Sequence, residues 1–295
     1  MKILIVSERF YPEVGAAPTR LKNMLDGFIS LGNRVDVLTS LPNYPKGEIF
    51  DEYKGCFYKF ESINESNIYR YWTYATISPN PIKRGLNMLS FSMMICFFAF
   101  KVKTCKSYDK VIVQTPTLFT AAAALILFKY LYRKKCILNV SDIWPSTAID
   151  MGAIRKNSLA HKIMLQYEKF LYKKSDAVLG QSEEILKHIQ SIVPNKLSFL
   201  YRNLQRGNIN IKYHKKNKIV KIVYAGSLGI AQDILGLIKN INFKNLGVEF
   251  HLYGGGNQTN SIIEYIETFP CNVFYHGYVD KSLMVAELSK YDASI

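Results

Sequence analysis

The chain has 295 residues, a formal net charge of +15 and a hydrophobic content of 48%, with 21% of its residues charged. This length and apolar content exceed what one ordinary α/β domain uses, so we expect more than one packed core. The cysteines are odd in number and form no Cys-x-x-Cys pair, which argues against a disulfide framework or zinc site and favours a reducing compartment: Cys56, Cys96, Cys105, Cys136 and Cys271.

Short β-branched runs recur along the first two thirds of the chain: KILIVS, VDVLT, KVIVQTP, KCILNVS, DAVLGQS and KLSFLY. Polar or turn residues end each run and helical stretches separate them, which predicts a doubly wound parallel sheet. In the first run a single Lys2 precedes Ile3-Leu4-Ile5-Val6 and Ser7-Glu8-Arg9 ends it, so it is too short for a secretory signal and is interpreted as a strand. Between the second and third runs, FYKFESINESNIYRYWTY predicts a hairpin turning at 64–67 or an irregular insertion.

The turn after the first strand is SERFYPEVGAAPTR. Gly15, Ala16 and Ala17 leave its backbone uncovered, and a helix is predicted to begin at Pro18. Amides at a strand-to-helix turn and the positive helix end favour an anionic ligand, and Arg20 adds a full charge. A small-residue turn that serves only helix–sheet packing explains the same pattern equally well.

Two apolar runs follow, LNMLSFSMMICFFAF at residues 86–100 and TAAAALILFKYLY at 120–132. The first has 15 residues and Lys129 interrupts the second, so neither reaches the roughly 20 apolar residues needed to span a bilayer. Both are interpreted as crossover helices packed on the sheet. The alternative is a peripheral face for an anionic membrane, because basic residues flank the first run: Lys83, Arg84, Lys101, Lys103 and Lys106.

Asp142 follows the strand run KCILNVS and precedes Ile143-Trp144-Pro145. This places a carboxylate at the carboxyl edge of the sheet, where α/β proteins bind ligands. A carboxylate there can accept a proton from a hydroxyl group or stabilise positive charge on a sugar ring. Asp142 is therefore the catalytic candidate, and the alternative is that it caps the next helix or holds its loop.

The composition changes after Tyr201 to the polar, basic passage RNLQRGNINIKYHKKNK. We place a first domain at 1–204, a basic linker at 205–218 and a second domain at 219–295. The linker lysines are interpreted as solvated rather than as a nucleic-acid contact, since no nucleic-acid-binding motif accompanies them. Beyond the linker, KIVYAG, VEFHLYGGG, NVFYHG and DASI alternate with helical stretches and predict a second Rossmann-like sheet, with a cleft between the two domains.

Glycines follow the first two strands of this second domain. In VYAGSLGIAQ, residues Gly226, Ser227 and Gly229 lie between a strand and a helix, a placement suited to a diphosphate. The spacing is not Gly-x-Gly-x-x-Gly and no acidic residue ends the next strand, so nicotinamide chemistry is disfavoured. Gly254 and Gly256 end the next strand, where a tight turn explains them as well as a ligand does.

The five histidines have no His-x-His or His-Glu-x-x-His spacing, so a metal site built from them is not expected. His251 lies inside a predicted strand and is interpreted as structural.

Five passages in order resemble the retaining family 4 glycosyltransferases of the GT-B fold, especially the branch that builds capsules, O-antigens and colanic-acid-like polysaccharides: FYPEVGAAPTR, LPNYPKGEIF, VSDIWP, YEKFLYKKSDAVLGQS and YAGSLGIAQDI. The resemblance implies that Asp142 faces the reaction centre. It implies acceptor contacts at Gly15, Ala16 and Arg20, and donor contacts at Gly226, Ser227, Gly229, Gln232, Gly254 and Gly256. The donor is a nucleotide-diphosphate sugar, and transfer needs no metal or other cofactor.

The resemblance also has gaps. Ser227 and Gln232 stand where family members often carry Arg and Lys, which leaves the charge partner of the diphosphate unassigned between Arg20 and Arg202. The last residues, KYDASI, read as the first half of a buried strand, and family members continue into a helix with two glutamates that hold the donor. We therefore expect an incomplete second domain, doubtful independent catalysis and a possible partner chain that covers it.

Three functions remain open from the sequence. The first is transfer of a sugar to a lipid-linked or saccharide acceptor, on the inner face of the cytoplasmic membrane. The second is a catalytically inactive remnant that serves as a binding module. The third, disfavoured, is a basic protein that binds nucleic acid through its charge.

Overall fold

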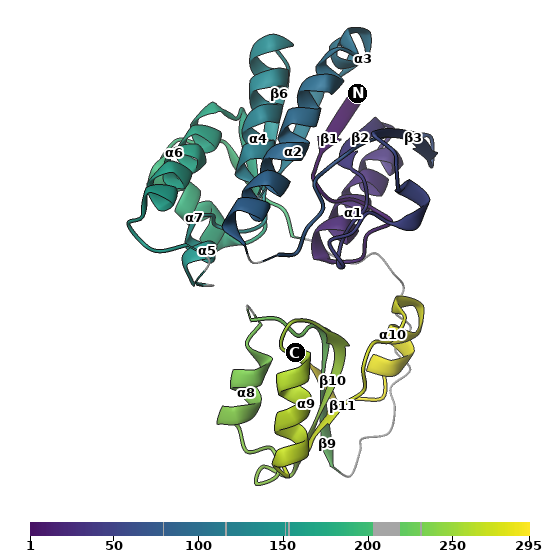
Figure 1. Ribbon diagram of the computed structural model, residues 1–295, viewed down its shortest axis with the longest axis vertical. Coiled ribbons are helices and arrows are strands. Elements are labelled where there is room, and N and C mark those ends of the chain that lie inside the picture. The colour runs from purple at the N-terminus through teal and green to yellow at the C-terminus, as the bar shows by residue number, and fades with distance from the viewer. Residues whose placement is uncertain (79, 116, 151, 153, 203–218, 231) are drawn as a thin grey trace. The chain divides into compact units, whose positions relative to one another are not determined.

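The computed structural model describes residues 1–78, 80–115, 117–150, 152, 154–202, 219–230 and 232–295 (Figure 1). Contacts divide the chain into two compact units, Met1–Arg206 and Gly207–Ile295. The linker expected at 205–218 lies outside the described residues, as do its lysines, so the domain limits at 204 and 219 stay predictions.

Unit 1 is built on an eight-stranded sheet in the order β3-β4-β2-β1-β5-β6-β7-β8. Every neighbouring pair is parallel except β3 and β4, which confirms the doubly wound parallel sheet. The strands are β1 (Lys2–Val6), β2 (Arg34–Ser40), β3 (Tyr58–Ile63), β4 (Ser66–Tyr71), β5 (Lys110–Gln114), β6 (Lys135–Val140), β7 (Ala177–Gly180) and β8 (Ser198–Leu200).

Strand β1 lies in the middle of this sheet and is apolar on both faces. Ile3 and Ile5 pack into one core cluster, whereas Leu4 and Val6 pack into the other. Alternate residues of a strand point to opposite faces, so a strand covered by helices on both sides reads as an unbroken apolar run.

One face of the sheet carries α1 (Ala16–Ser30), whose Leu21, Met24 and Leu25 are buried. Helix α1 begins two residues before Pro18, with Gly15 as its N-cap, because proline is tolerated within the first helical turn. The other face carries α2 (Pro81–Ala99), α4 (Leu118–Leu125), α6 (Leu159–Lys174) and α7 (Glu183–Ile192). Shorter segments complete the unit: η1 (Asp51–Tyr53), α3 (Val102–Ser107), the π-helical η2 (Ile126–Leu131) and α5 (Ser146–Asp150).

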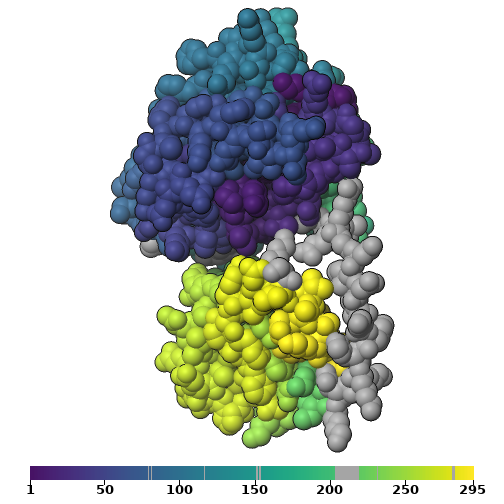
Figure 2. Space-filling model, turned by 90° about the vertical axis from the view of Figure 1, so that its right-hand side faces the viewer, coloured from purple at the N-terminus to yellow at the C-terminus, as the bar shows by residue number. Residues whose placement is uncertain are grey.

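Strands β3 and β4 form a hairpin, so the alternative of an irregular insertion is wrong. Asn64 and Glu65 make its turn with positive φ angles of 47° and 66°. Strand β4 also pairs with β2, which joins the hairpin to the main sheet. In Figure 2 this blue-violet part of the chain covers much of one face of unit 1 and adjoins the purple N-terminal residues.

The two apolar runs form crossover helices on the sheet, as the first interpretation expects. Phe91, Ile95 and Phe98 of α2 and Leu125 of α4 are buried. No helix in the described part of the chain is long and apolar enough to cross a membrane. The opposite side of α2 nevertheless exposes a series of apolar side chains to solvent, so simple burial does not account for the whole run.

Unit 2 is built on a four-stranded parallel sheet in the order β11-β10-β9-β12. Its strands are β9 (Val220–Ser227), β10 (Val248–Gly255), β11 (Val273–Tyr275) and β12 (Ala293–Ser294), and its helices are α8 (Ile234–Asn240), α9 (Thr259–Thr268) and α10 (Lys281–Leu288). These confirm the predicted order of elements. The final strand was expected to be buried, but Ala293 and Ser294 are exposed, because β12 pairs only with β9 at the sheet edge.

His251 lies within β10 and forms a stacked histidine pair with His276. Their rings are 5.1 Å apart, and His251 Nδ1 lies 2.8 Å from His276 Nε2. The other ring nitrogen of His251, Nε2, lies 3.2 Å from Glu249 Oε2, and Glu249 also pairs with Lys221. The negative charge of Glu287 favours the protonated form of His276. Burial lowers the pKa of both histidines below the usual value. This agrees with a structural role for His251.

The histidine pair predicts that unit 2 loses stability in mild acid. Because both pKa values are lowered on folding, the unfolded chain binds more protons as the pH falls through about 6.5. The free energy of unfolding should therefore decrease between about pH 7.5 and pH 5. Urea unfolding followed over this range should show the decrease for the wild-type chain and a flatter profile for His251→Gln/His276→Gln. An equally steep profile in the double variant would assign the effect to other groups.

Candidate active site

The carboxyl edge of the unit 1 sheet holds the residues that sequence reasoning assigned to acceptor binding and catalysis. From β1 the chain first adds β2 and the hairpin strands on one side of the sheet, and then returns to add β5 to β8 on the other side. The strand order therefore reverses between the neighbouring strands β1 and β5. In open α/β sheets the ligand site lies at such a reversal, beyond the carboxyl ends of the strands. The Gly15 turn follows β1 and Asp142 follows β6, one strand beyond β5.

Arg20 projects from the first turns of α1 and is buried at this edge. Its guanidinium donates hydrogen bonds to Ser141 Oγ at 2.6 Å and to Gln181 Oε1 at 2.7 Å. Ser141 follows β6 and Gln181 follows β7, so the guanidinium joins α1 to the ends of two strands. The Nε atom of Arg20 is buried without a hydrogen-bond partner among the described residues. Burial also lowers the Arg20 pKa from its usual value, opposed by the charge of Asp142.

Asp142 lies beside this arginine, next in sequence to Ser141. The protein packed around the carboxyl group raises its pKa above the usual range, and the charge of Arg20 opposes that rise. The residue as a whole is nevertheless exposed to solvent. Its carboxylate accepts no hydrogen bond from the residues that the structure describes. No hydrogen bond among them therefore supports the alternative that Asp142 caps the next helix or holds its loop.

Glu13 holds the turn after β1 in place. Its carboxylate accepts hydrogen bonds from the backbone amides of Phe10, Asn43 and Tyr44, at 3.1, 3.0 and 2.9 Å. These bonds join the turn after β1 to the loop after β2. A Cβ atom on Gly15 would lie 3.5 Å from the Tyr44 ring. The Arg9 guanidinium lies over the same ring, 4.3 Å from its centroid. The turn that carries the acceptor candidates Gly15 and Ala16 is thus held in place by the hydrogen bonds of Glu13.

Glu8, the second residue after β1, was not singled out from the sequence. Burial raises the pKa of its carboxyl group to about 7, and one of its oxygens is buried without a partner among the described residues. Ser141 and Gln181 were also missed. The signal for all three is their position within two residues of the end of a buried strand, but the sequence does not tell which of these positions turn toward one another.

The six donor candidates gather on unit 2, at the carboxyl ends of β9 and β10. Gly226 pairs in register with Gly254, and Leu228 N donates to Gly255 O at 3.0 Å. A Cβ atom on Gly229 would lie 2.9 Å from Gln232 Oε1 and 3.4 Å from Ser227 Oγ. The turn of Gly226, Ser227 and Gly229 therefore lies directly against the turn that ends β10.

Close backbone packing is the reason for glycine at two of these positions. A Cβ atom on Gly254 would overlap the Gly226 carbonyl oxygen, and one on Gly256 would overlap the Leu228 carbonyl oxygen. Gly254 also has a φ of +123°, which side chains disfavour. The tight-turn interpretation accounts for this pair, and their donor contacts stay a prediction.

Replacing Gly254 by alanine is expected to destabilise unit 2 by about 1–3 kcal/mol, because the two strand ends must separate to admit a methyl group. Gly255→Ala provides a matched control, since its Cβ meets only Thr259 Oγ1 at 4.0 Å. Urea unfolding of the two variants should separate them clearly. Equal midpoints would show that the strand ends yield without cost.

The helix after the Gly226 turn already carries an acidic N-cap. Asp233 Oδ1 accepts a hydrogen bond from Gly236 N at 3.2 Å. The positive end of α8 is therefore partly neutralised within the protein. Arg202, one candidate partner for a diphosphate, lies 3.7 Å from Glu183 in unit 1. The other candidate, Arg20, bonds to Ser141 and Gln181 as described above.

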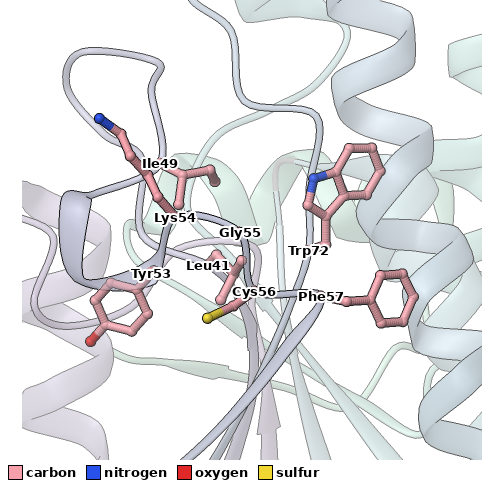
Figure 3. A pocket seen from close by; sticks show the side chains of 8 residues that line it. All are labelled: Leu41, Ile49, Tyr53, Lys54, Gly55, Cys56, Phe57 and Trp72. Atoms are coloured by element: carbon pink, nitrogen blue, oxygen red, sulfur yellow. The ribbon is translucent and has the colours of Figure 1, made fainter.

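A pocket of about 560 Å³ opens beside the carboxyl ends of β2 and β4 (Figure 3). In this view Trp72 and Phe57 lie on one side, and Tyr53 and Lys54 lie on the other. Its remaining lining residues are Leu41, Ile49, Gly55 and Cys56. Apart from Lys54, the lining is dominated by apolar and aromatic side chains, and nothing in the sequence predicted this pocket.

No protein-family model matches the chain. The chain is 27% identical over 156 residues to the putative colanic acid biosynthesis glycosyl transferase WcaI of Escherichia coli (strain K12). That match covers 53% of this chain and 38% of the relative, so it spans well under half of the relative's length.

Solved structures resemble the chain over its whole length. The crystal structure of Anabaena Alr3699/HepE in complex with UDP and glucose matches with a TM-score of 0.62 at 12% identity, covering 100% of this chain and 73% of that one. An E. coli structure named as trehalose-6-phosphate bound with UDP-2-fluoro glucose matches with a TM-score of 0.63 at 10% identity, covering 100% and 77%. The apo lipopolysaccharide outer core galactosyltransferase WaaB matches with a TM-score of 0.54 at 15% identity, covering 100% and 73%. At these identities the likeness establishes the fold, which is GT-B with two Rossmann-like units.

Proposed function

We propose that this chain belongs to a glycosyltransferase that moves a sugar from a nucleotide-diphosphate donor to a lipid-linked or saccharide acceptor. The observation that carries the proposal is the pair of Arg20 and Asp142 at the carboxyl edge of unit 1, where a carboxylate of raised pKa stands beside a buried guanidinium. The GT-B fold supports it, as do the similar proteins, which include a colanic acid biosynthesis glycosyl transferase and structures in complex with UDP or a UDP-sugar.

Each group has a defined task in this proposal. The Asp142 carboxylate faces the anomeric carbon, where it accepts the acceptor proton or stabilises developing positive charge, and the sugar is transferred with retention. The positive charge of Arg20 favours the ionised form of Asp142. It also attracts anionic groups of the substrate to the carboxyl edge of the unit 1 sheet. The bare amides around Gly226, Ser227 and Gly229, with Gln232, hold the leaving diphosphate without a metal ion.

The cellular setting forms the second part of the proposal. The name of the E. coli relative refers to colanic acid biosynthesis, which supports surface polysaccharide assembly as the pathway. The acceptor is then presented at the cytoplasmic face of the membrane, and the enzyme is a peripheral protein there. Capsule and lipopolysaccharide synthesis are the related settings.

Titration calorimetry with UDP and GDP tests donor binding by the chain itself. Saturable heat from one nucleotide is the expected result, because the Gly226 turn binds a diphosphate. Absence of heat at millimolar nucleotide would contradict the proposal and favour a binding module without a donor site. Salt-dependent affinity for oligonucleotides would instead favour the nucleic-acid alternative.

A further inference from the structure

The outer side of α2 is an exposed apolar face. Six large apolar side chains recur every three or four residues along it, with exposed fractions between 46% and 81%: Ile82, Leu86, Leu89, Met93, Phe97 and Phe100. This spacing places them on one side of the helix, opposite the buried Phe91, Ile95 and Phe98. At about 1.5 Å per residue, the face is roughly 27 Å long. Such a continuous apolar face marks an interaction site.

The α2 face continues onto the hairpin side of unit 1. Phe57 contacts Phe97 edge-on, with ring centroids 5.7 Å apart and an interplanar angle of 87°. Phe57 is itself 52% exposed, and Trp72 lies beside it at the pocket of Figure 3. The apolar surface is therefore wider than one helix, and it includes an aromatic residue whose fluorescence reports its surroundings.

Basic residues without acidic neighbours border this surface. Between Glu65 and Asp142 the chain has eleven basic residues and a single acidic one, Asp109. None of the basic residues at the two ends of α2 forms an ion pair with a described carboxylate: Lys83, Arg84, Lys101, Lys103 and Lys106. The apolar face thus carries unneutralised positive charge at both ends.

A groove at the C-terminal end of α2 combines both features. It has a volume of about 700 Å³ and is lined by Phe100, Val102 and Leu131, with Lys106 and Arg133 at its walls and Ala99 and Tyr132 completing it. The Tyr132 hydroxyl donates a hydrogen bond to the Ala99 carbonyl, which fastens η2 to the end of α2. An apolar floor with two cations suits a phosphate group attached to a hydrocarbon chain.

We propose that the α2 face docks flat on an anionic phospholipid bilayer, with the Phe100–Arg133 groove holding a lipid headgroup. This specifies the surface behind the membrane setting proposed above and rests on that setting. A second copy of the chain is a poorer occupant, because a symmetric dimer through this face would bring two sets of unpaired cations together. A bilayer with anionic headgroups neutralises these cations and buries the apolar side chains at the same time.

Docking in this way brings the carboxyl edge of the unit 1 sheet toward the lipid surface at its β4 end. The Asn87 side chain donates to Tyr74 O at 2.7 Å, and Ser90 Oγ lies 3.1 Å from Thr73 Oγ1. Thr73 and Tyr74 follow the carboxyl end of β4, so the first half of α2 adjoins the carboxyl edge of the sheet, four strands along from β6 and Asp142. A lipid-linked acceptor then reaches this edge without leaving the bilayer.

Vesicle flotation tests the docking surface independently of sugar transfer. The wild-type chain should float with vesicles of mixed phosphatidylcholine and phosphatidylglycerol, and not with phosphatidylcholine alone. Leu86→Ser/Met93→Ser/Phe97→Ser should weaken binding about 100-fold or more, and Lys101→Gln/Lys103→Gln/Lys106→Gln about 10- to 100-fold. The matched control, Leu31→Ser/Leu159→Ser/Leu246→Ser, removes apolar side chains that are more exposed but lie elsewhere, and it should bind as the wild type does.

A depth measurement identifies the docked face directly. In a Trp144→Phe background, Trp72 is the only tryptophan, and its fluorescence should shift to the blue and be quenched by brominated phosphatidylglycerol. The proposal is overturned if the apolar triple variant floats like the wild type, if Trp72 is not quenched, or if the face instead mediates concentration-dependent dimerisation. Binding to vesicles by a chain that binds no nucleotide would refute only the proposed function.

Discussion

Replacing Asp142 by asparagine is expected to lower the rate of sugar transfer by about 10²–10⁴-fold. The amide keeps the shape of the carboxylate but can neither accept the proton of the acceptor hydroxyl nor stabilise positive charge on the sugar ring. Because the donor contacts are assigned to unit 2, the affinity for the nucleotide sugar should stay near the wild-type value. The two quantities are measured by transfer of a labelled sugar and by titration calorimetry.

Asp150→Asn is the control for this variant, because Asp150 is an exposed carboxylate eight residues further along, at the end of α5. It should leave transfer unchanged. The ionised form of Asp142 is the active one, so wild-type activity should fall as the pH drops through a pKa that burial has raised above the usual aspartate range. Full transfer by Asp142→Asn would remove the residue from the mechanism.

Replacing Glu61 by leucine is expected to lower the free energy of unfolding of unit 1 by about 3–5 kcal/mol. Its partner Arg70 is fully buried, and Arg70 Nε lies 2.5 Å from Glu61 Oε2. Tyr53 Oη donates to the other carboxylate oxygen at 2.7 Å. Without Glu61, a buried guanidinium loses its counter-charge, and the leucine side chain offers no hydrogen-bond acceptor in its place.

The same substitution should disturb the candidate active site. Arg70 also donates a hydrogen bond to the carbonyl of Tyr11, in the turn that leads to Gly15 and Arg20. If the Arg70 guanidinium moves toward solvent, its hydrogen bond to the Tyr11 carbonyl breaks, and this turn is no longer held to the β3–β4 hairpin. We therefore expect acceptor-dependent activity to fall in Glu61→Leu even under conditions where the variant remains folded.

Denaturant unfolding of three variants checks the stability effect. Arg70→Met/Glu61→Leu should be more stable than Glu61→Leu alone, since it removes the stranded charge. Asp51→Asn breaks the fully hydrated pair with Lys54 and should change little. If the double variant were as unstable as Glu61→Leu, packing rather than the unpaired charge would be the cause.

Much of the architecture was predictable from local patterns. The apolar runs that became β1, β5 and β6 are buried on both faces, so their composition alone marks them as central strands of a parallel sheet. The hairpin turn at Asn64 and Glu65 was also recognisable, although pattern alone left an irregular insertion open. Asp142 and Arg20 could be singled out because each follows a predicted strand or its turn.

The partners of those residues were not predictable. Ser141 and Gln181 bind the Arg20 guanidinium across separations of 121 and 161 residues. The role of Gly254 follows from the Gly226 carbonyl opposite it, which is a contact between two different strands. The pocket at Trp72 and Phe57 likewise requires the loop after β2 to meet the end of β4.

The sequence by itself determined the elements of this protein, their order and the edge of the sheet where chemistry belongs, because strand and helix periods and turn residues act over a few neighbours. Only the tertiary structure decided which polar groups meet at that edge and which side of α2 stays uncovered. Residues 86–100 read as one largely apolar run, and burial of Phe91, Ile95 and Phe98 against the sheet left Met93 and Phe97 in solvent. Which side chains become buried depends on packing between segments that are distant in the chain, and a local sequence pattern contains no information about that packing.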